Sequence, residues 1–371
     1  MRLAQGSAGA VLTVDLGALQ NNYRYLLAQL AGARCGAAVK ADAYGLGARR
    51  VAQALYQAGC RDFFVAHLHE AIDLRTELAT DAAIYVMHGS PVGLEAEFLM
   101  HRCTPVLNSL QQVAAWRRLA KLQQRALPAI VQFDTGMARM GLDHAETQQF
   151  LHHAELREGL AIQFLMSHLA VAERHDDAFN HLQLQRMQAI QQALPGLPVT
   201  LANSSGIFLG PAFHFALARP GAALYGVNPH LNQVNPMQAV AYLQGRIIQT
   251  REIPAGTGVG YGASWVSQRT SRIATVGVGY ADGWLRSLSN RGWVEIAGHK
   301  VRMVGNVSMD TITLDVSDIA SEYLQEGALV DLLSDRITVD QVAACAGTIG
   351  YEILTSLGAR YERLYRQASS E

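Results

Sequence analysis

Short apolar runs alternate with longer amphipathic segments along the first two-thirds of the chain. The segments 110–126 and 179–194 carry apolar residues at intervals of three and four positions, which is the spacing of one helix face. The apolar runs between such segments have the length and side chains of buried strands. Eight runs of this kind occur, at 36–40, 63–68, 83–88, 104–108, 129–134, 163–168, 199–204 and 214–219. Eight strands alternating with helices predict an α/β fold, a TIM (β/α)8 barrel, with a doubly wound parallel sheet as the alternative.

The pattern changes after residue 234. Runs such as RIIQTREI, SRIATVGVGY and ALVDLL are β-branched or alternating and are separated by turns that contain glycine. They predict a second, mostly β domain over 235–371, after a barrel domain over 1–234. The run at about 10–16 is a further strand candidate before a helix expected at 17–30, and it is available to pair with the β domain.

The amino-acid composition limits the kinds of partner that we expect this protein to bind. The chain has 371 residues, of which 50% are hydrophobic and 16% charged, and its formal net charge is -1. A chain of this length buries a large core, and its near-neutral charge without basic runs argues against nucleic acid or a membrane surface as a partner. The N-terminal stretch lacks a long apolar segment behind a basic start, so we expect a cytoplasmic protein that binds small molecules or other subunits.

The four cysteines give no sign of a disulfide framework or of a zinc site. Cys35, Cys60, Cys103 and Cys345 lie far apart, and no two of them form a CxxC pair. This usage is typical of a reducing compartment, and no metal is expected.

Polar side chains follow several of the predicted strands. Lys40, His168 and Arg219 each end an apolar run, and Asn203 and Ser204 end another. In a TIM barrel these positions meet at the C-terminal ends of the strands, which is the working face. The glycine-containing turns 203–206 and 219–226 are suited to binding a phosphate through backbone N–H groups. A lysine beside such a site suggests a Schiff base to pyridoxal phosphate.

A family resemblance covers nearly the whole chain. Eight fragments in matching order resemble bacterial alanine racemases: AVKADAYGLGA, DTGMARMGL, MSHLAVAE, ANSSG, ARPGAALYGV, GVGYGASW, VGYADGW and GNVSMD. The resemblance implies a pyridoxal phosphate enzyme that racemises alanine as a homodimer with composite active sites. It also implies a role in supplying D-alanine for peptidoglycan.

The resemblance further implies roles for individual residues. Lys40 would hold pyridoxal phosphate and then act as one of two bases at the substrate Cα, and Tyr261 in GVGYGASW is similar to the opposing base. Arg219 resembles the arginine that faces the pyridine nitrogen, and His168 would bridge Arg219 and Tyr261. Arg139 resembles the arginine at the cofactor O3′ and the substrate carboxylate.

The remaining site residues fall into two sets by the same resemblance. The phosphate-binding set would be Tyr44, Ser204 and the backbone of Gly221 and Ala222, and Asn203, at the end of a predicted strand, is expected to be a further cofactor-binding residue. The residues expected to close the substrate pocket are Tyr280, Met309 and Asp310.

Two positions depart from the family pattern. Gln132 stands where many members carry a carbamylated lysine, so we expect it either to accept a hydrogen bond from Arg139 or to leave room for an anion such as chloride. Ala359 stands where some members have a phosphate-contacting tyrosine. Tyr361 is not expected to replace it, because a shift of two residues turns a side chain to another face or level.

Other functions stay open at this point. A serine or broad-specificity racemase is the nearest alternative, because one hydroxyl group changes binding too little to be read from a sequence. A fold-type III decarboxylase would favour an acid in place of Arg219, and a non-catalytic pyridoxal phosphate carrier would not need Tyr261. The motif HLHE at 67–70 suggests a metal-dependent hydrolase, but no carboxylate-rich strand ends accompany it.

Overall fold

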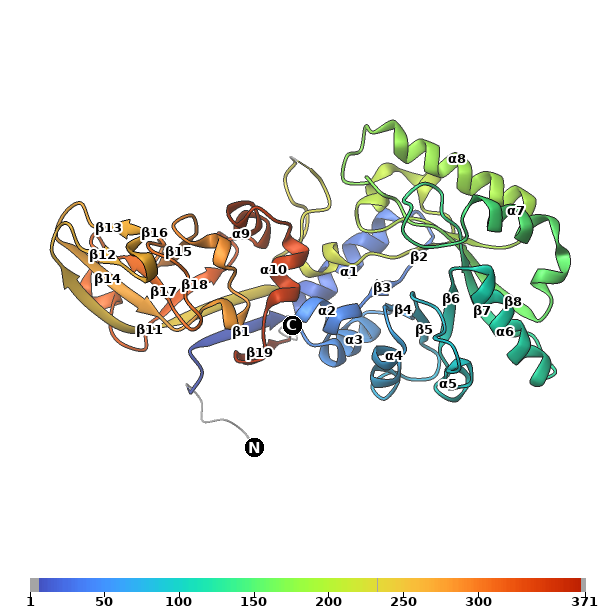
Figure 1. Ribbon diagram of the computed structural model, residues 1–371, viewed down its shortest axis with the longest axis horizontal. Coiled ribbons are helices and arrows are strands. Elements are labelled where there is room, and N and C mark those ends of the chain that lie inside the picture. The colour runs from blue at the N-terminus through green and yellow to red at the C-terminus, as the bar shows by residue number, and fades with distance from the viewer. Residues whose placement is uncertain (1–6, 232, 368–371) are drawn as a thin grey trace.

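The N-terminal two-thirds of the chain form a ring of parallel strands surrounded by helices (Figure 1). The computed structural model describes residues 7–231 and 233–367. Seven strands form one parallel sheet in chain order. They are β3 (Ala37–Ala38), β4 (Asp62–Val65), β5 (Ala83–Val86), β6 (Thr104–Leu107), β7 (Leu127–Gln132), β8 (Leu160–Met166) and β9 (Val199–Thr200).

Two further short strands close the ring between β9 and β3. Arg219 N donates to Ala202 O beyond the end of β9 (2.8 Å), and Gly36 N donates to Ala218 O (2.9 Å). The predicted barrel is thereby confirmed, although several strands are shorter than the apolar runs. The mostly β second domain, described below, is confirmed as well. The closing strands are β2 (Arg34–Cys35) and β10 (Leu217–Ala218), which pair in parallel.

One set of alternate strand side chains fills the inside of the barrel. Phe64 stacks on Tyr85 with ring centroids 4.8 Å apart, and Phe164 contacts the edge of Tyr85. Because the outer face of each strand packs on helices, both faces are apolar, which explains why the strands read as continuous hydrophobic runs. The inner cluster consists of Ala38, Phe64, Tyr85, Val106, Ile130, Phe164, Met166 and Leu217.

Polar residues cap the start of helices α1 (Leu16–Gln29), α6 (Leu110–Leu122), α7 (His144–His152) and α8 (Ala178–Ala193) around the barrel. Asp15, Ser109, Asp143 and Asp177 each accept a hydrogen bond from a backbone N–H in the first turn of the helix that follows. Further helices of the barrel domain are α3 (Ala48–Gln57), α4 (Leu68–Arg75) and α5 (Glu95–Met100). Short 3-10 turns are η1 (Ala154–Arg157), η2 (Ser205–Leu209), η3 (Pro211–Phe213) and η4 (Ala222–Tyr225).

The second domain is built on an eight-stranded sheet that includes a strand from the N-terminus. Strand β1 (Ala10–Asp15) pairs antiparallel with β11 (Ala241–Ile253) and parallel with β19 (Glu362–Arg366). The other strands of the domain are β12 (Gly258–Val259), β13 (Trp265–Val266), β14 (Ser271–Val276), β15 (Trp293–Ile296), β16 (His299–Arg302), β17 (Ile312–Asp315) and β18 (Leu329–Leu333). Its helical segments are α9 (Val339–Ala346), α10 (Gly350–Ser356), η5 (Tyr261–Ala263), η6 (Tyr280–Asp282), η7 (Arg286–Leu288) and η8 (Ser321–Tyr323).

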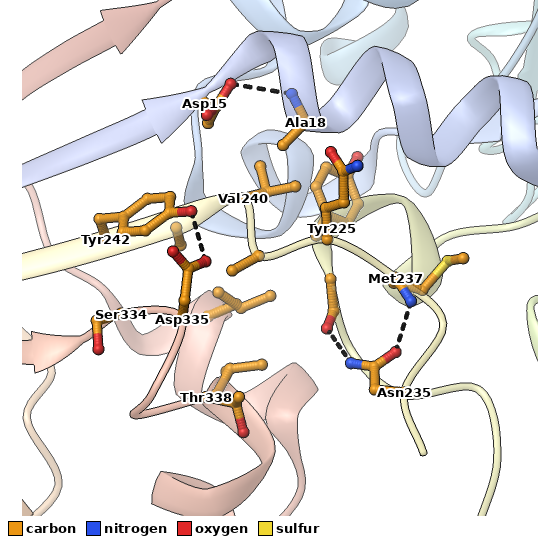
Figure 2. A pocket seen from close by; sticks show the side chains of 16 residues that line it. Asp15, Ala18, Tyr225, Asn235, Met237, Val240, Tyr242, Ser334, Asp335 and Thr338 are labelled. Atoms are coloured by element: carbon orange, nitrogen blue, oxygen red, sulfur yellow. Dashed lines mark hydrogen bonds between the residues drawn. The ribbon is translucent and has the colours of Figure 1, made fainter. Parts of the chain in front are cut away.

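A pocket of about 420 Å³ lies where the two domains join. Figure 2 shows the polar contacts around it: Tyr242 donates to Asp335 (2.8 Å), and Asn235 Nδ2 donates to the Gly226 carbonyl (2.8 Å). Asp15, which caps α1, also pairs with Arg366 of β19. The contacts of Asn235 and Asp15 tie the barrel domain to the β domain, whereas the contact between Tyr242 and Asp335 lies within the β domain. No helix among the described residues is long and apolar enough to cross a lipid bilayer.

Candidate active site

Lys40 begins an unusual turn directly after β3. This turn, α2 (Lys40–Gly45), contains four successive residues, Ala41 to Tyr44, with φ between 52° and 56°, so it is left-handed. No glycine stands among the four, although left-handed backbone normally favours glycine. The turn is held by Ala48 N, which donates to Asp42 Oδ1 (2.7 Å), and by Gly47 N, which donates to the Asp42 carbonyl (2.9 Å).

A pocket of about 270 Å³ opens at the C-terminal ends of the barrel strands. It gathers residues from the first, second, third, sixth, seventh and eighth strands predicted from the sequence, and Arg139 from the loop after the fifth, as the working face of a barrel does. The lining residues are Ala38, Lys40, Ala41, Tyr44, Phe64, Met87, Arg139, His168, Asn203, Ser204, Arg219, Gly221, Ala222, Tyr351 and Thr355.

The Lys40 amine lies in a setting that favours its neutral form. Burial lowers its pKa below the ordinary value, the positive charge of Arg139 lowers it further, and the carboxylate of Glu70 opposes both effects. A lysine with a lowered pKa is a better nucleophile and base near neutral pH.

Arg219 is buried with neutral hydrogen-bond acceptors around it. Its Nη1 donates to Thr200 Oγ1 (2.6 Å), and its Nη2 donates to the Ser167 carbonyl (2.7 Å). Burial lowers the pKa of Arg219 to about 9, so the group stays charged at neutral pH. Among the described residues, no acceptor binds Nε of this guanidinium.

The contact with Arg219 fixes the tautomer of His168. Arg219 Nη2 lies 3.3 Å from His168 Nδ1, and a guanidinium can only donate, so Nδ1 must accept. Burial and the positive charges of Arg219, Arg139 and Lys40 hold the pKa of His168 well below its usual range. The neutral imidazole therefore carries its proton on Nε2, which can donate to a further group.

The turns after β9 and β10 form a corner rich in backbone donors. Ser204 Oγ accepts hydrogen bonds from Gly221 N (3.0 Å) and Ala223 N (3.2 Å). The N–H of Ala222, between them, has no acceptor among the described residues. A Cβ at position 221 would stand 2.3 Å from the hydroxyl oxygen of Tyr44, so glycine is needed for this approach. An unpaired amide beside two hydroxyl groups suits a phosphate.

The loop that carries Arg139 is organised from within. Asp134 Oδ1 accepts from Gly136 N (2.8 Å) and Met137 N (2.9 Å). Buried Gln132 donates through Nε2 to the Met140 carbonyl (3.3 Å) and forms no hydrogen bond with Arg139. In the described chain the exposed Arg139 guanidinium has no hydrogen-bond or ion-pair partner, which leaves the anion alternative as the remaining prediction for this position.

Helix α10 contributes two pocket residues that the sequence did not indicate. Tyr351 and Thr355 line the pocket, and the Tyr351 ring lies 6.0 Å from that of Tyr44. Tyr361 is buried away from the pocket lining, and its hydroxyl has no hydrogen-bond partner. The tyrosine placed near Tyr44 is therefore Tyr351, in the YE pair itself, and no local periodicity distinguishes it.

The predicted residues of the β domain do not join this pocket within one chain. Tyr261 is 76% exposed on η5, in the hairpin of β12 and β13. Figure 1 places that hairpin at the end of the β domain remote from the barrel. Tyr280 and Met309 are also exposed and lie close together, since Ala281 N donates to the Met309 carbonyl (3.0 Å). Asp310 pairs with Arg360 (2.8 Å).

The HLHE motif has a structural role. Glu70 accepts hydrogen bonds from the backbone N–H groups of Ala66 (2.7 Å) and His67 (2.9 Å) at the start of α4. The described residues contain no cluster of three or more His, Cys, Asp or Glu side chains arranged to hold a metal ion.

Comparisons with known proteins agree on one family. Residues 14–229 match the family model "Alanine racemase, N-terminal domain", and residues 240–365 match "Alanine racemase, C-terminal domain". A Rhizobium johnstonii protein named "Alanine racemase, catabolic" is 48% identical, over 98% of this chain and 96% of its own.

Solved structures of the same name share the fold. An alanine racemase from Bartonella henselae with covalently bound pyridoxal phosphate has a TM-score of 0.93 and 42% identity, covering 96% of this chain and 99% of that one. The biosynthetic alanine racemase of Pseudomonas aeruginosa has a TM-score of 0.89 and 34% identity over the same shares.

Proposed function

The chain belongs to the alanine racemase family, and we propose that it interconverts L-alanine and D-alanine with pyridoxal phosphate bound at Lys40. The observation that carries this proposal is the pocket at the strand ends, where a lysine of lowered pKa, an unpaired arginine Nε and an unpaired backbone amide face one space.

The residues of the pocket fit this cofactor. Tyr44, Ser204 and the backbone of Gly221 and Ala222 would hold the phosphate, together with Asn203 in the adjacent turn. Arg219 would present Nε to the pyridine nitrogen and, as a donor that keeps its proton, would leave that nitrogen unprotonated. When bound, pyridoxal phosphate withdraws electrons from the substrate Cα and so makes its proton acidic enough for a side-chain base.

Two bases would act on opposite faces of Cα. Lys40 Nζ would take or deliver the proton on one face, and its lowered pKa keeps a larger neutral fraction for that role. Tyr261 would serve the other face. His168, with its proton on Nε2, would donate to the phenol oxygen of Tyr261 and stabilise its ionised form.

Tyr261 would come from a second copy of the chain. Its exposed position outside the barrel pocket supports a homodimer in which each β domain completes the site of the other subunit. Tyr280, Met309 and Asp310 would close the substrate pocket from the same side. Arg139 would bind the substrate carboxylate, since its guanidinium faces the pocket without a protein partner among the described residues.

Mixed dimers test the composite site. Lys40→Ala and Tyr261→Phe proteins, each nearly inactive, are unfolded together and reassembled. A mixed dimer has one site with both defects and one with neither, so activity should return to about a quarter of the original value, because half the dimers are mixed. If Tyr261 acted within its own chain, every site would keep a defect and the mixture would stay inactive.

We also propose that the enzyme is cytoplasmic and supplies D-alanine for peptidoglycan. The free cysteines, three of them buried, support a reducing compartment. Growth of a D-alanine auxotroph that expresses this chain tests the supply. Turnover of a panel of L-amino acids, with detection of each D-product, tests alanine against serine and larger substrates.

A further inference from the structure

A single carboxylate links the turn after Lys40 to the neighbouring strand. Glu70 Oε1 accepts a hydrogen bond from Ala41 N (2.6 Å), while Oε2 accepts from Ala66 N and His67 N. Ala41 directly follows Lys40 and is the first residue of the left-handed turn. Glu70 therefore bridges the chain after β3 and the chain after β4, although it lies 29 residues from Ala41 in sequence.

We propose that Glu70 is a positioning residue that holds the left-handed turn at Ala41 and thereby aims the Lys40 amine into the active-site pocket. This inference rests on the proposed function of Lys40. Ala41 lines the active-site pocket, whereas Glu70 lines a neighbouring pocket of about 610 Å³, so Glu70 acts on Lys40 through the backbone.

The chemistry of the bridge requires a carboxylate. Its two oxygens accept from three backbone N–H groups, and bonds to an ionised acceptor are stronger than those to a neutral one. A carboxamide keeps one acceptor oxygen and directs an NH2 group toward the remaining N–H donors. Glu70→Gln is therefore nearly isosteric but cannot serve both Ala41 and the start of α4.

Glu70 also contributes charge near Lys40. The charged or titratable groups that face Lys40 are Arg139, His168, His88 and Glu70, and Glu70 is the acid among them. Removal of its charge leaves the effects of burial and Arg139 on the Lys40 pKa unopposed. The Lys40 amine should then titrate at lower pH.

The experiment compares Glu70→Gln and Glu70→Asp with the control Glu77→Gln. Glu77 lies in the turn after α4 and accepts from Arg49 (3.1 Å) and Gln53 (2.7 Å) of α3, so Glu77→Gln removes a carboxylate near the other end of α4 without touching Ala41. Glu70→Asp keeps the charge at the start of α4 but is shorter by one methylene group.

The first readout uses the protein without cofactor. Hydrogen exchange at the Ala41 amide should be ~10-fold faster or more in both Glu70 variants, as for a lost charged hydrogen bond, and unchanged in Glu77→Gln. The pH midpoint of Lys40 acetylation should fall in Glu70→Gln only. Equal exchange in all proteins would overturn the proposal.

The second readout separates positioning from stability. With cofactor, kcat of both Glu70 variants should fall ~10-fold to 100-fold with little change in KM, as for a misplaced reacting group. Loss of thermal stability with unchanged kcat would overturn the proposal, because it would leave Glu70 a helix cap alone. Borohydride labelling of a lysine other than Lys40 would overturn the proposed function instead, while the exchange result would still report on the bond between Glu70 and Ala41.

Discussion

The rim of the barrel and the outer face of the β domain differ in how they hold a functional side chain, as Arg219 and Tyr261 show. Arg219 is 5% exposed and donates to Thr200, Ser167 and His168, so its position is fixed before any ligand binds. Tyr261 is 76% exposed, and its hairpin is held through its carbonyl, which accepts from Asn306 Nδ2 (2.7 Å). The barrel rim holds Arg219 in place before a ligand binds, whereas the β domain presents Tyr261 to solvent.

Because of this difference, we expect the barrel pocket to bind the cofactor and the exposed residues of the β domain to complete the site. A pocket built within one chain can hold a cofactor without help, whereas exposed residues act only after another surface meets them. Two copies of one chain satisfy both conditions when they pair around a two-fold axis.

The largest expected effect is a loss of kcat at a residue of either region, and the absorbance of the cofactor distinguishes the two regions. Lys40→Ala and Tyr261→Phe should each reduce kcat by ~10³-fold or more, because each removes one of the two proposed general bases. Only Lys40→Ala should also lose the visible absorbance of the covalently held cofactor, because Tyr261 lies outside the pocket that binds it. Absorbance spectra and racemisation rates of the purified variants measure both effects.

Isotope exchange sharpens the same comparison. In D₂O, Tyr261→Phe should still exchange the α-proton of one alanine enantiomer through Lys40 and lose exchange from the other. Equal loss from both enantiomers would contradict a role for Tyr261 as a base.

A smaller effect is expected inside the barrel, at Arg219. Because a positive neighbour disfavours the imidazolium, Arg219→Met should raise the pKa of His168, while burial should still hold it below the ordinary value. Activity should fall ~10²-fold, since preorganised charge is lost. NMR titration of the His168 ring measures the shift. Arg219→Lys keeps the charge without the planar fork, and it should move the pKa less.

The smallest expected effect tests whether the part of the site that the barrel contributes needs a bound anion. Arg139 has no partner in the described structure, so an anion beside it should support substrate binding. At constant ionic strength, KM should change several-fold between chloride and a larger anion, and Gln132→Lys should remove that dependence. Indifference of the original protein to the anion would contradict this prediction.

Much of the barrel follows from hydrophobic pattern, whereas the turn after Lys40 does not. Parallel strands covered on both faces read as apolar runs, and each predicted run in the barrel overlaps an observed strand, although several strands are only two residues long. Ala41 to Tyr44 contain no glycine to indicate positive φ. Left-handed backbone costs roughly 4 to 8 kcal/mol over four such residues. Only tertiary contacts such as those of Asp42 and Glu70 offset that cost, and a local sequence does not show them.

The remaining site residues depended on contacts between distant segments. Tyr351 reaches the barrel pocket from α10, which packs on α2. Gln132 was expected to accept a hydrogen bond from Arg139 or to leave room for an anion. Its amide donates to Met140 and does not bond Arg139, because the loop folds back on β7, and the anion stays a prediction. Residue type and spacing indicate which side chains have suitable chemistry, and loop geometry decides which of them meet.

Strand β1 is synthesised long before the two strands with which it pairs. Strand β1 ends at residue 15, but its neighbours β11 and β19 begin at residues 241 and 362. At a translation rate of about 5–20 residues per second, roughly 10 to 50 seconds pass before the first partner exists. The barrel strands are complete by Ala218, so the barrel can fold on the ribosome while β1 stays an open edge. Synthesis of β19 then covers the remaining edge of β1, so a strand made late protects a strand made early from aggregation.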